Sequence, residues 1–166
     1  MTVGNMTLVE TLSFLALCAQ FLVVWFAYQA IKRNEATAKK RAIVDLILKQ
    51  RDDKRLSNIF KQLYKWRMEK ESITEQCKDP HIHDDVIYAL DTMEFIAVGI
   101  RLNAFDEAVY KELQCTKVIK TWDSVSGFVM ELREKKNCRT LYQDLEQLAN
   151  SWNAKPIQEL KKEKYK

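Results

Sequence analysis

The chain has 166 residues, of which 47% are hydrophobic, and its 27 Lys and Arg against 23 Asp and Glu give a formal charge of +4. Its 3 Gly and 2 Pro are too few for the tight turns of an all-β domain or the phosphate-binding turns of a doubly wound α/β domain. The apolar content and the balanced charge exclude a disordered chain, so we expect an all-α protein.

The first predicted element is a transmembrane helix over residues 11–31, which contain no charged side chain and are bounded by Glu10 and Lys32. A helix of this length spans about 32 Å, close to the roughly 30 Å of a bilayer core. A cleaved signal peptide would have a basic start and a shorter apolar run, and a buried soluble helix would have a polar face. Because the segment has none of these features, we predict a single uncleaved membrane anchor.

Small and polar residues recur along this helix at spacings of three and four. Such a row lets two helix backbones approach closely, and Gln20 near the middle of the span would seek a hydrogen-bond partner. We therefore expect a homo-oligomer that packs through this row, although chance composition with Gln20 bonded to its own helix is the alternative. The row consists of Ser13, Ala16, Gln20, Val23, Ala27 and Ala30.

Basic residues cluster just after the apolar segment, whereas residues 1–10 contain none. The positive-inside rule makes residues 1–10 a short extracytoplasmic tail and places the C-terminal part in the cytoplasm. The chain is therefore expected to cross the inner membrane of the cell once. The same cluster can bind anionic lipid headgroups. Nucleic-acid binding is not expected, because acidic residues are interleaved nearly everywhere. The cluster is Lys32, Arg33, Lys39, Lys40 and Arg41.

The cytoplasmic part is predicted to be a bundle of about five helices. The membrane helix continues through a basic juxtamembrane helix, residues 32–52, and Asp52 and Asp53 end it. The domain itself spans residues 53–153, and residues 154–166 form a polar tail. A second helix is predicted by a face at helical spacing, made of Leu56, Ile59, Phe60, Leu63 and either Trp66 or Arg67.

The rest of the domain is predicted from caps and turn residues. Residues 77–85 are predicted to form a loop around Pro80. A third helix is predicted to start at Asp84 or Asp85 and to end near Leu102. A turn with a cap follows at residues 103–106. Shorter helices fit residues 106–114, 117–135 and 140–152. We expect Gly99 to permit close approach of a neighbouring helix. The expected core of the third helix is Phe95, Ile96, Val98 and Ile100, with Trp122 and Trp152 among their partners.

One loop collects residue types that bind metals. Two His at i and i+2 could face one ion from an extended loop, but the spacing is not that of a structural zinc site, and the alternative is a solvated loop. No nucleophile, zincin, Walker A or dinucleotide-binding motif occurs, so we expect neither an enzyme nor a cofactor. The weak metal candidates are Cys77, His81, His83 and Asp85.

Glu94 and Arg101 lie seven residues apart on one face of a mostly apolar helix. They are either a contact for a ligand or partner, or half-buried ions that are each matched to a charge on another helix.

Several short sequence segments in the second half of the chain resemble a bacterial and phage family catalogued as a domain of unknown function, number four-seven-six-zero. The resemblance implies one N-terminal membrane helix, a basic segment and a helical domain, with no established activity. The segments are Glu94 to Arg101, Phe105-Asp106-Glu107, Trp122, Leu132-Arg133, Leu141-Tyr142 and Leu145 to Trp152.

The expected function is that of a non-enzymatic membrane-anchored protein, whose cytoplasmic helical domain binds an unknown protein partner or a signal at the inner membrane face. The alternative is an effector or exclusion factor in the conflict between phage and bacterium, for example in phage defence, which acts through oligomerised transmembrane helices.

Overall fold

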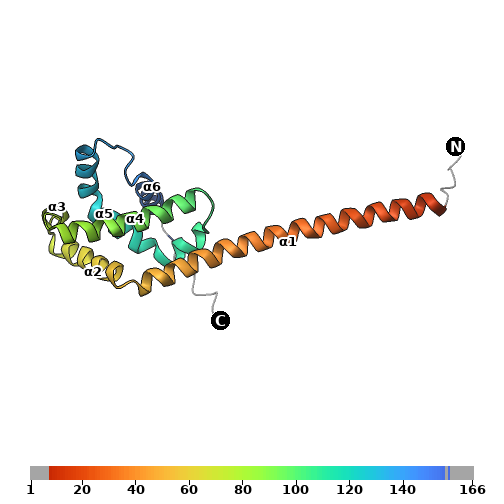
Figure 1. Ribbon diagram of the computed structural model, residues 1–166, viewed down its shortest axis with the longest axis horizontal. Helices are drawn as coiled ribbons and strands as arrows, with labels where there is room; N and C mark the ends of the chain where they lie inside the picture. Colours follow the sequence, from red (N-terminus) through yellow and green to blue (C-terminus); the bar gives the residue numbers. More distant parts are fainter. Residues whose placement is uncertain (1–7, 156, 158–166) are drawn as a thin grey trace. The chain divides into compact units, whose positions relative to one another are not determined.

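The structure is a computed structural model that describes residues 8–155 and residue 157, and all regular structure in this part of the chain is helical (Figure 1). The all-α prediction is confirmed. Residues 1–7 and most of the predicted polar tail lie outside the described residues. The helices are α1 (Leu8–Asp52), α2 (Lys54–Glu69), α3 (Ile73–Gln76), α4 (Pro80–Arg101), α5 (Glu107–Lys135) and α6 (Gln143–Ala154).

The chain divides into two compact units, which meet between Ala38 and Lys39 within α1. The first unit contains the part of α1 that precedes residue 39. The second contains the end of α1 together with α2 to α6, and we call it the bundle.

In the first unit, residues 8–38 form one uninterrupted helix that is apolar over most of its length. Its best window of 18 residues has a mean hydropathy of 1.8 and none of that window is buried, so α1 is long and apolar enough to cross a membrane. Large side chains such as Phe21 and Phe26 are about two-thirds exposed or more. The prediction that the helix continues well past residue 31 is confirmed, since α1 ends at Asp52.

The end of α1 and the whole of α2 provide one wall of the bundle core. Ile43 and Ile47 of α1 are buried, and α2 buries Leu56, Ile59, Leu63 and Trp66, which confirms most of its predicted apolar face. Asp53 separates the two helices as expected: its carboxylate accepts a hydrogen bond from the Leu56 amide at 3.0 Å and caps α2.

Helix α4 begins four to five residues earlier than predicted. The loop expected over residues 77–85 is wrong from Pro80 onward, because Pro80 is the first residue of the helix and Asp79 caps it by accepting from the His81 amide at 2.8 Å. Proline suits this position, where its missing N–H would have no helical partner. The true cap is therefore Asp79, and not Asp84 or Asp85.

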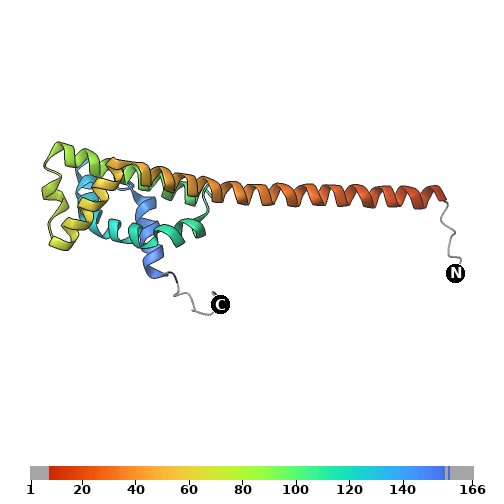
Figure 2. The same cartoon turned by 90° about the horizontal axis from the view of Figure 1, so that it is seen from below.

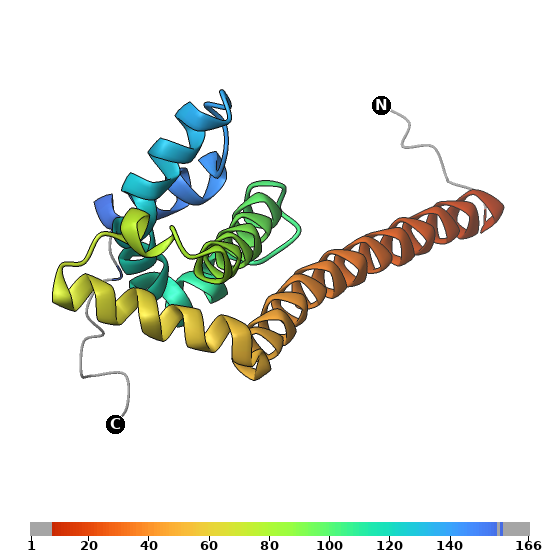
Figure 3. The same ribbon diagram turned by 60° about the vertical axis from the view of Figure 1, so that its left-hand side comes forward.

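Helix α4 packs against α2 and α6 (Figure 3). Its buried residues recur at spacings of three and four, and they include Met93 and Ile96. Residue 95 falls off this stripe, so the expectation that Phe95 is buried is wrong: its side chain is 60% exposed. Val98 and Ile100 are half-buried, whereas Trp122 and Trp152 are buried as predicted.

The turn after α4 and the cap of α5 are confirmed. Asn103 adopts a positive φ of 57°, and the Asp106 carboxylate accepts from the Val109 amide at 3.0 Å. The close approach at Gly99 comes from this turn and not from a neighbouring helix, because an added Cβ would overlap the Phe105 ring.

Helix α5 is one helix, and the predicted break near residues 115 and 116 is wrong. Cys115 and Val118 face the core on either side of that point, so burial holds the helix together where propensity is weak. Helix α5 packs against α2, α3 and α6 (Figure 2). Helix α6 begins at Gln143 rather than residue 140, after a connection in which Asn137 and Tyr142 have positive φ.

Candidate functional site

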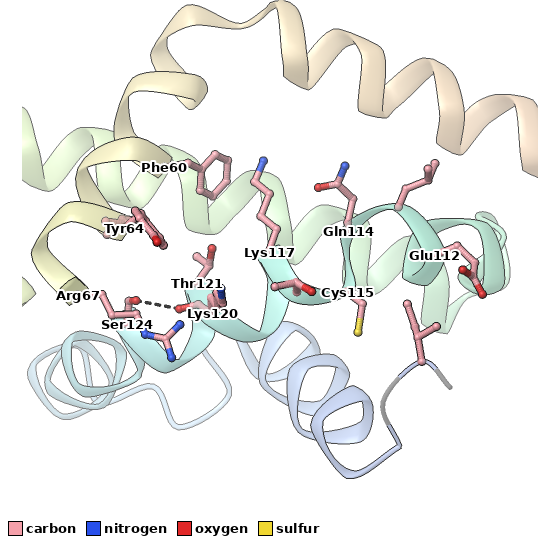
Figure 4. Close-up of a pocket in the computed structure, with 14 residues that line it drawn as sticks. Phe60, Tyr64, Arg67, Glu112, Gln114, Cys115, Lys117, Lys120, Thr121 and Ser124 are labelled. Carbon is pink, nitrogen blue, oxygen red and sulfur yellow. Dashed lines mark hydrogen bonds between the residues drawn. The ribbon is translucent and has the colours of Figure 1, made fainter. Parts of the chain in front are cut away.

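Two adjoining cavities, of about 420 and 430 Å³, lie along the surface between α2 and α5 and share the side chains of Phe60, Tyr64, Gln114 and Lys117. The second cavity also reaches the end of α1 at Gln50 (Figure 4 shows the first cavity). We call the two cavities together the groove. The residues that define it below are Gln50, Phe60, Tyr64, Arg67, Lys117 and Lys120.

Helical periodicity explains why these side chains meet. Phe60, Tyr64 and Arg67 follow one another at spacings of four and three along α2, and the buried residues of α2 occupy the other face. On α5, Lys117 and Lys120 are three residues apart and flank the buried Val118. Each helix therefore presents one face to the core and a neighbouring face to the groove.

Lys117 carries a charge that the bundle does not neutralise. Its Nζ lies 3.7 Å from the centroid of the Phe60 ring, and Figure 4 shows the ammonium group beside that ring. Among the described residues no carboxylate forms an ion pair with it. Burial lowers the pKa of this lysine from its ordinary value, because the charged form loses hydration without gaining a counter-charge.

Gln50 is the second unsatisfied group in the groove. Its side chain is only 8% exposed, and its amide nitrogen Nε2 has no hydrogen-bond partner in the described part of the chain. Buried polar groups nearly always have a partner. Gln50 lines the second cavity, but this nitrogen is closed to solvent, so its N–H groups do not face the open space.

The groove is positively charged and partly aromatic. Arg67 is matched by Asp123 at 3.3 Å, and the Lys120 ammonium lies 6.0 Å from the centroid of the Tyr64 ring. The arrangement can hold an anion at the ammonium groups, which lie beside two aromatic rings. Of the charged side chains that line it in the described residues, Glu112 is the one anion, and the cations are Arg51, Lys61, Arg67, Lys117 and Lys120.

Glu94 and Arg101 both bind the first turn of α6. The Arg101 Nε donates to the Asp144 carboxylate at 2.6 Å, which confirms that this ion is matched by a charge on another helix. Glu94 is matched instead by the amides of Asp144 and Leu145, at 3.2 and 2.7 Å. Burial raises the pKa of Glu94. Both side chains are therefore engaged within the bundle.

The structure does not bring the four metal candidates together. His81 and His83 lie on the helical first turns of α4, where residues two apart point to nearly opposite sides. His83 packs edge-on against Phe128, and Asp85 forms an ion pair with Arg55 at 2.5 Å. Burial raises the pKa of Cys77 to about 11, so its thiol is a poor ligand. In the described residues no group of three or more His, Cys, Asp and Glu side chains could hold a metal ion.

The residues predicted to act at the membrane all lie on α1. The side chains of the small and polar row, from Ser13 to Ala30, are exposed in the single chain, and so are most of the basic residues, with Lys39 half-buried. The Lys32 ammonium lies 5.6 Å from the centroid of the Tyr28 ring. Oligomerisation and lipid binding stay predictions.

Sequence patterns alone did not indicate the groove. Its residues are distributed over three helices between positions 50 and 120, and the burial of Lys117 and Gln50 depends on how these helices pack. One partial signal was present, because Tyr64 and Arg67 extend the α2 pattern with an aromatic and a basic residue next to the buried stripe.

Comparison with known proteins identifies a family but no function. The family described as "Domain of unknown function (DUF4760)" matches residues 14–152, which include most of α1 and nearly all of the bundle. No curated protein and no solved structure matches the chain.

Proposed function

The chain belongs to the DUF4760 family of unknown function, and we propose that it is a membrane-anchored, non-enzymatic protein whose bundle binds a partner or a signal at the inner face of the membrane. The observation that carries the proposal is the groove, where Lys117 keeps a half-buried charge that no described carboxylate pairs with. Such a charge costs stability in the unliganded protein, and ligand binding is a reason for retaining it.

The membrane part of the proposal rests on α1. The exposed apolar helix supports anchoring, and the basic residues that follow it, Lys32 to Arg41, support a cytoplasmic position for the bundle. The same basic residues would contact anionic headgroups at that face.

A photo-crosslinking experiment tests the binding function. Tyr64, which lies in the groove and is 53% exposed, is replaced by a photoreactive phenylalanine analogue in the full chain within native membranes. We expect a specific adduct from this position. The control is the same replacement at Met130, which is 43% exposed but outside the groove. The absence of adducts at position 64, or the same adducts at position 130, would refute the proposal.

A second candidate function is a membrane-acting effector or exclusion factor in the conflict between phage and bacterium. The observation that favours it is the exposed row on α1 with Gln20 near its middle. In hydrocarbon, close packing and hydrogen bonds of about 0.6–2 kcal/mol each must supply helix association.

Overexpression separates the two candidates. An effector should collapse the membrane potential, and Gln20→Leu should abolish this effect, whereas Leu22→Ala, off the row, should leave it intact. A cysteine placed at position 20 should also cross-link between chains more readily than the native Cys18. An unchanged membrane potential, together with no cross-linking, would exclude the effector.

A further inference from the structure

Lys117 lines both cavities, and no described carboxylate pairs with its ammonium group. A half-buried cation without a counter-charge points to one kind of missing group, an anion with oxygen acceptors. A neutral apolar ligand would leave the ammonium group unsatisfied, and a cationic one would be repelled.

The number of cations around the groove favours a phosphate over a single carboxylate. A carboxylate carries one charge, whereas a phosphate monoester carries about −1.5 to −2 near neutral pH and offers three acceptor oxygens. Arg51, Lys61 and Lys120 accompany Lys117 at the groove, while Glu112 is the one acidic side chain that lines it in the described part of the chain. The charge thus complements a multiply charged anion.

The size and walls of the groove limit the rest of the ligand. A cavity of about 420 Å³ lies within the range of small-molecule sites. Tyr64, which is 53% exposed, offers aromatic surface beside the lysines, and a flat or apolar group attached to the phosphate would pack there.

We propose that the groove is a binding site for a small phosphate-bearing ligand, with Lys117 holding the phosphate and with Tyr64 packing against the rest of the molecule. The proposal rests on the proposed binding function and specifies its ligand. The phosphate can belong to a free nucleotide-like molecule or to the headgroup of phosphatidic acid, since both present a terminal phosphate.

Calorimetric titration of the full chain in nanodiscs of phosphatidylcholine tests this. The test ligands are ADP, inorganic pyrophosphate and soluble dihexanoyl phosphatidic acid. We expect saturable binding of at least one of them. Binding of ADP or pyrophosphate identifies a free ligand, and binding of the phosphatidic acid alone identifies a headgroup.

Three variants locate the binding. Lys117→Met keeps most of the length of the side chain and removes the charge, and it should weaken binding about tenfold or more, as expected for a lost charged hydrogen bond. Lys120→Met should also weaken it, and it tests the same groove if the first variant misfolds. Lys135→Met removes an equal charge from the exposed end of α5, outside the groove, and should bind like the unaltered chain.

Binding of none of the three ligands overturns the proposal, and so does equal binding by Lys117→Met and the unaltered chain. If position 64 still gives specific photo-adducts in that case, the binding function stands and only the phosphate assignment falls.

Discussion

Glu94 holds α6 in place from the side of α4. Its carboxylate accepts from the Asp144 and Leu145 amides, which belong to the first turn of α6 and have no acceptor within that helix. Arg101 pairs with the neighbouring Asp144 carboxylate, so two residues of one helix fix the start of another.

We expect Glu94→Ala to destabilise the bundle by about 1–3 kcal/mol, because it leaves two backbone donors without their acceptor. Glu94→Gln is the matched control, since it keeps an acceptor oxygen and should cost less. Urea unfolding followed by tryptophan fluorescence measures both. If both variants lost the same free energy of unfolding, the Glu94 carboxylate would not stabilise the bundle by capping α6.

The difference in stability between the unaltered chain and Glu94→Gln should depend on pH. Burial raises the pKa of Glu94 above its ordinary value of 4.5, so the folded chain binds this proton more tightly than the unfolded chain does. The stability that Glu94 contributes is therefore greatest below that value and falls as pH rises through the native pKa. From about pH 4 to about pH 7, the free energy of unfolding of the unaltered chain should fall relative to that of Glu94→Gln. A relative rise over this range would contradict the raised pKa of Glu94.

Phe95 and Ile96 are neighbours with opposite environments. Ile96 is fully buried, whereas Phe95 is mostly exposed and touches the Phe105 ring edge-on, with centroids 5.9 Å apart. Ile96→Ala should cost about 2–5 kcal/mol of unfolding free energy, and Phe95→Ala no more than about 1 kcal/mol. Thermal and urea unfolding check this, and a larger loss at Phe95 would place it in the core after all.

At the scale of elements, the turn between α4 and α5 depends on Gly99. The Gly99 carbonyl accepts from the amides of Ala104 and Phe105, and the Phe105 ring occupies the space where a Cβ would be. The missing side chain therefore lets the turn fold back on the end of α4.

We expect Gly99→Ala to destabilise the bundle by about 1–3 kcal/mol, although alanine favours a helix by about 1 kcal/mol. The reason is steric, so Phe105→Leu in the same chain should recover part of the loss. A double-mutant cycle measures this coupling. Simple additivity of the two substitutions would mean that Phe105 does not limit the space at Gly99.

Helices with a clear apolar stripe and a cap were predictable from the sequence. Helix α2 combines Asp53 with apolar residues at helical spacing, and α1 lacks any breaker between its apolar and basic parts. The start of α4 was not predicted because Pro80 fits both a loop and a first helical turn. The continuity of α5 depends on Cys115 and Val118 being buried, which is a tertiary effect that local propensity does not contain.

At the scale of the whole molecule, the anchor was predictable and the groove was not. Hydrophobicity is a local property of residues 11–31, but the groove exists only where α1, α2 and α5 place residues 50, 64 and 117 around one space. Glu94 and Arg101 stood out as charges on an apolar helix, yet their partners on α6 were not visible in the sequence.

Topology is a property of the complete chain and is tested with reporters. A fusion after Lys166 should be active as a cytoplasmic reporter and silent as a periplasmic one. Neutralising the basic cluster from Lys32 to Arg41, with basic residues added before Glu10, should weaken or reverse this pattern. Periplasmic activity of the unmodified fusion would refute the cytoplasmic placement.

The central claim is that the groove keeps its charge for binding and not for the fold, and the stability of Lys117→Met tests it most directly. In the unliganded chain this substitution removes an ammonium group that lies over Phe60 without a carboxylate partner among the described residues. We predict that the free energy of unfolding in urea stays within about 0.5 kcal/mol of the unaltered chain or rises, because the relief of desolvation offsets the lost cation–π contact. A loss of more than about 1.5 kcal/mol would show that Lys117 stabilises the bundle, and it would contradict the account.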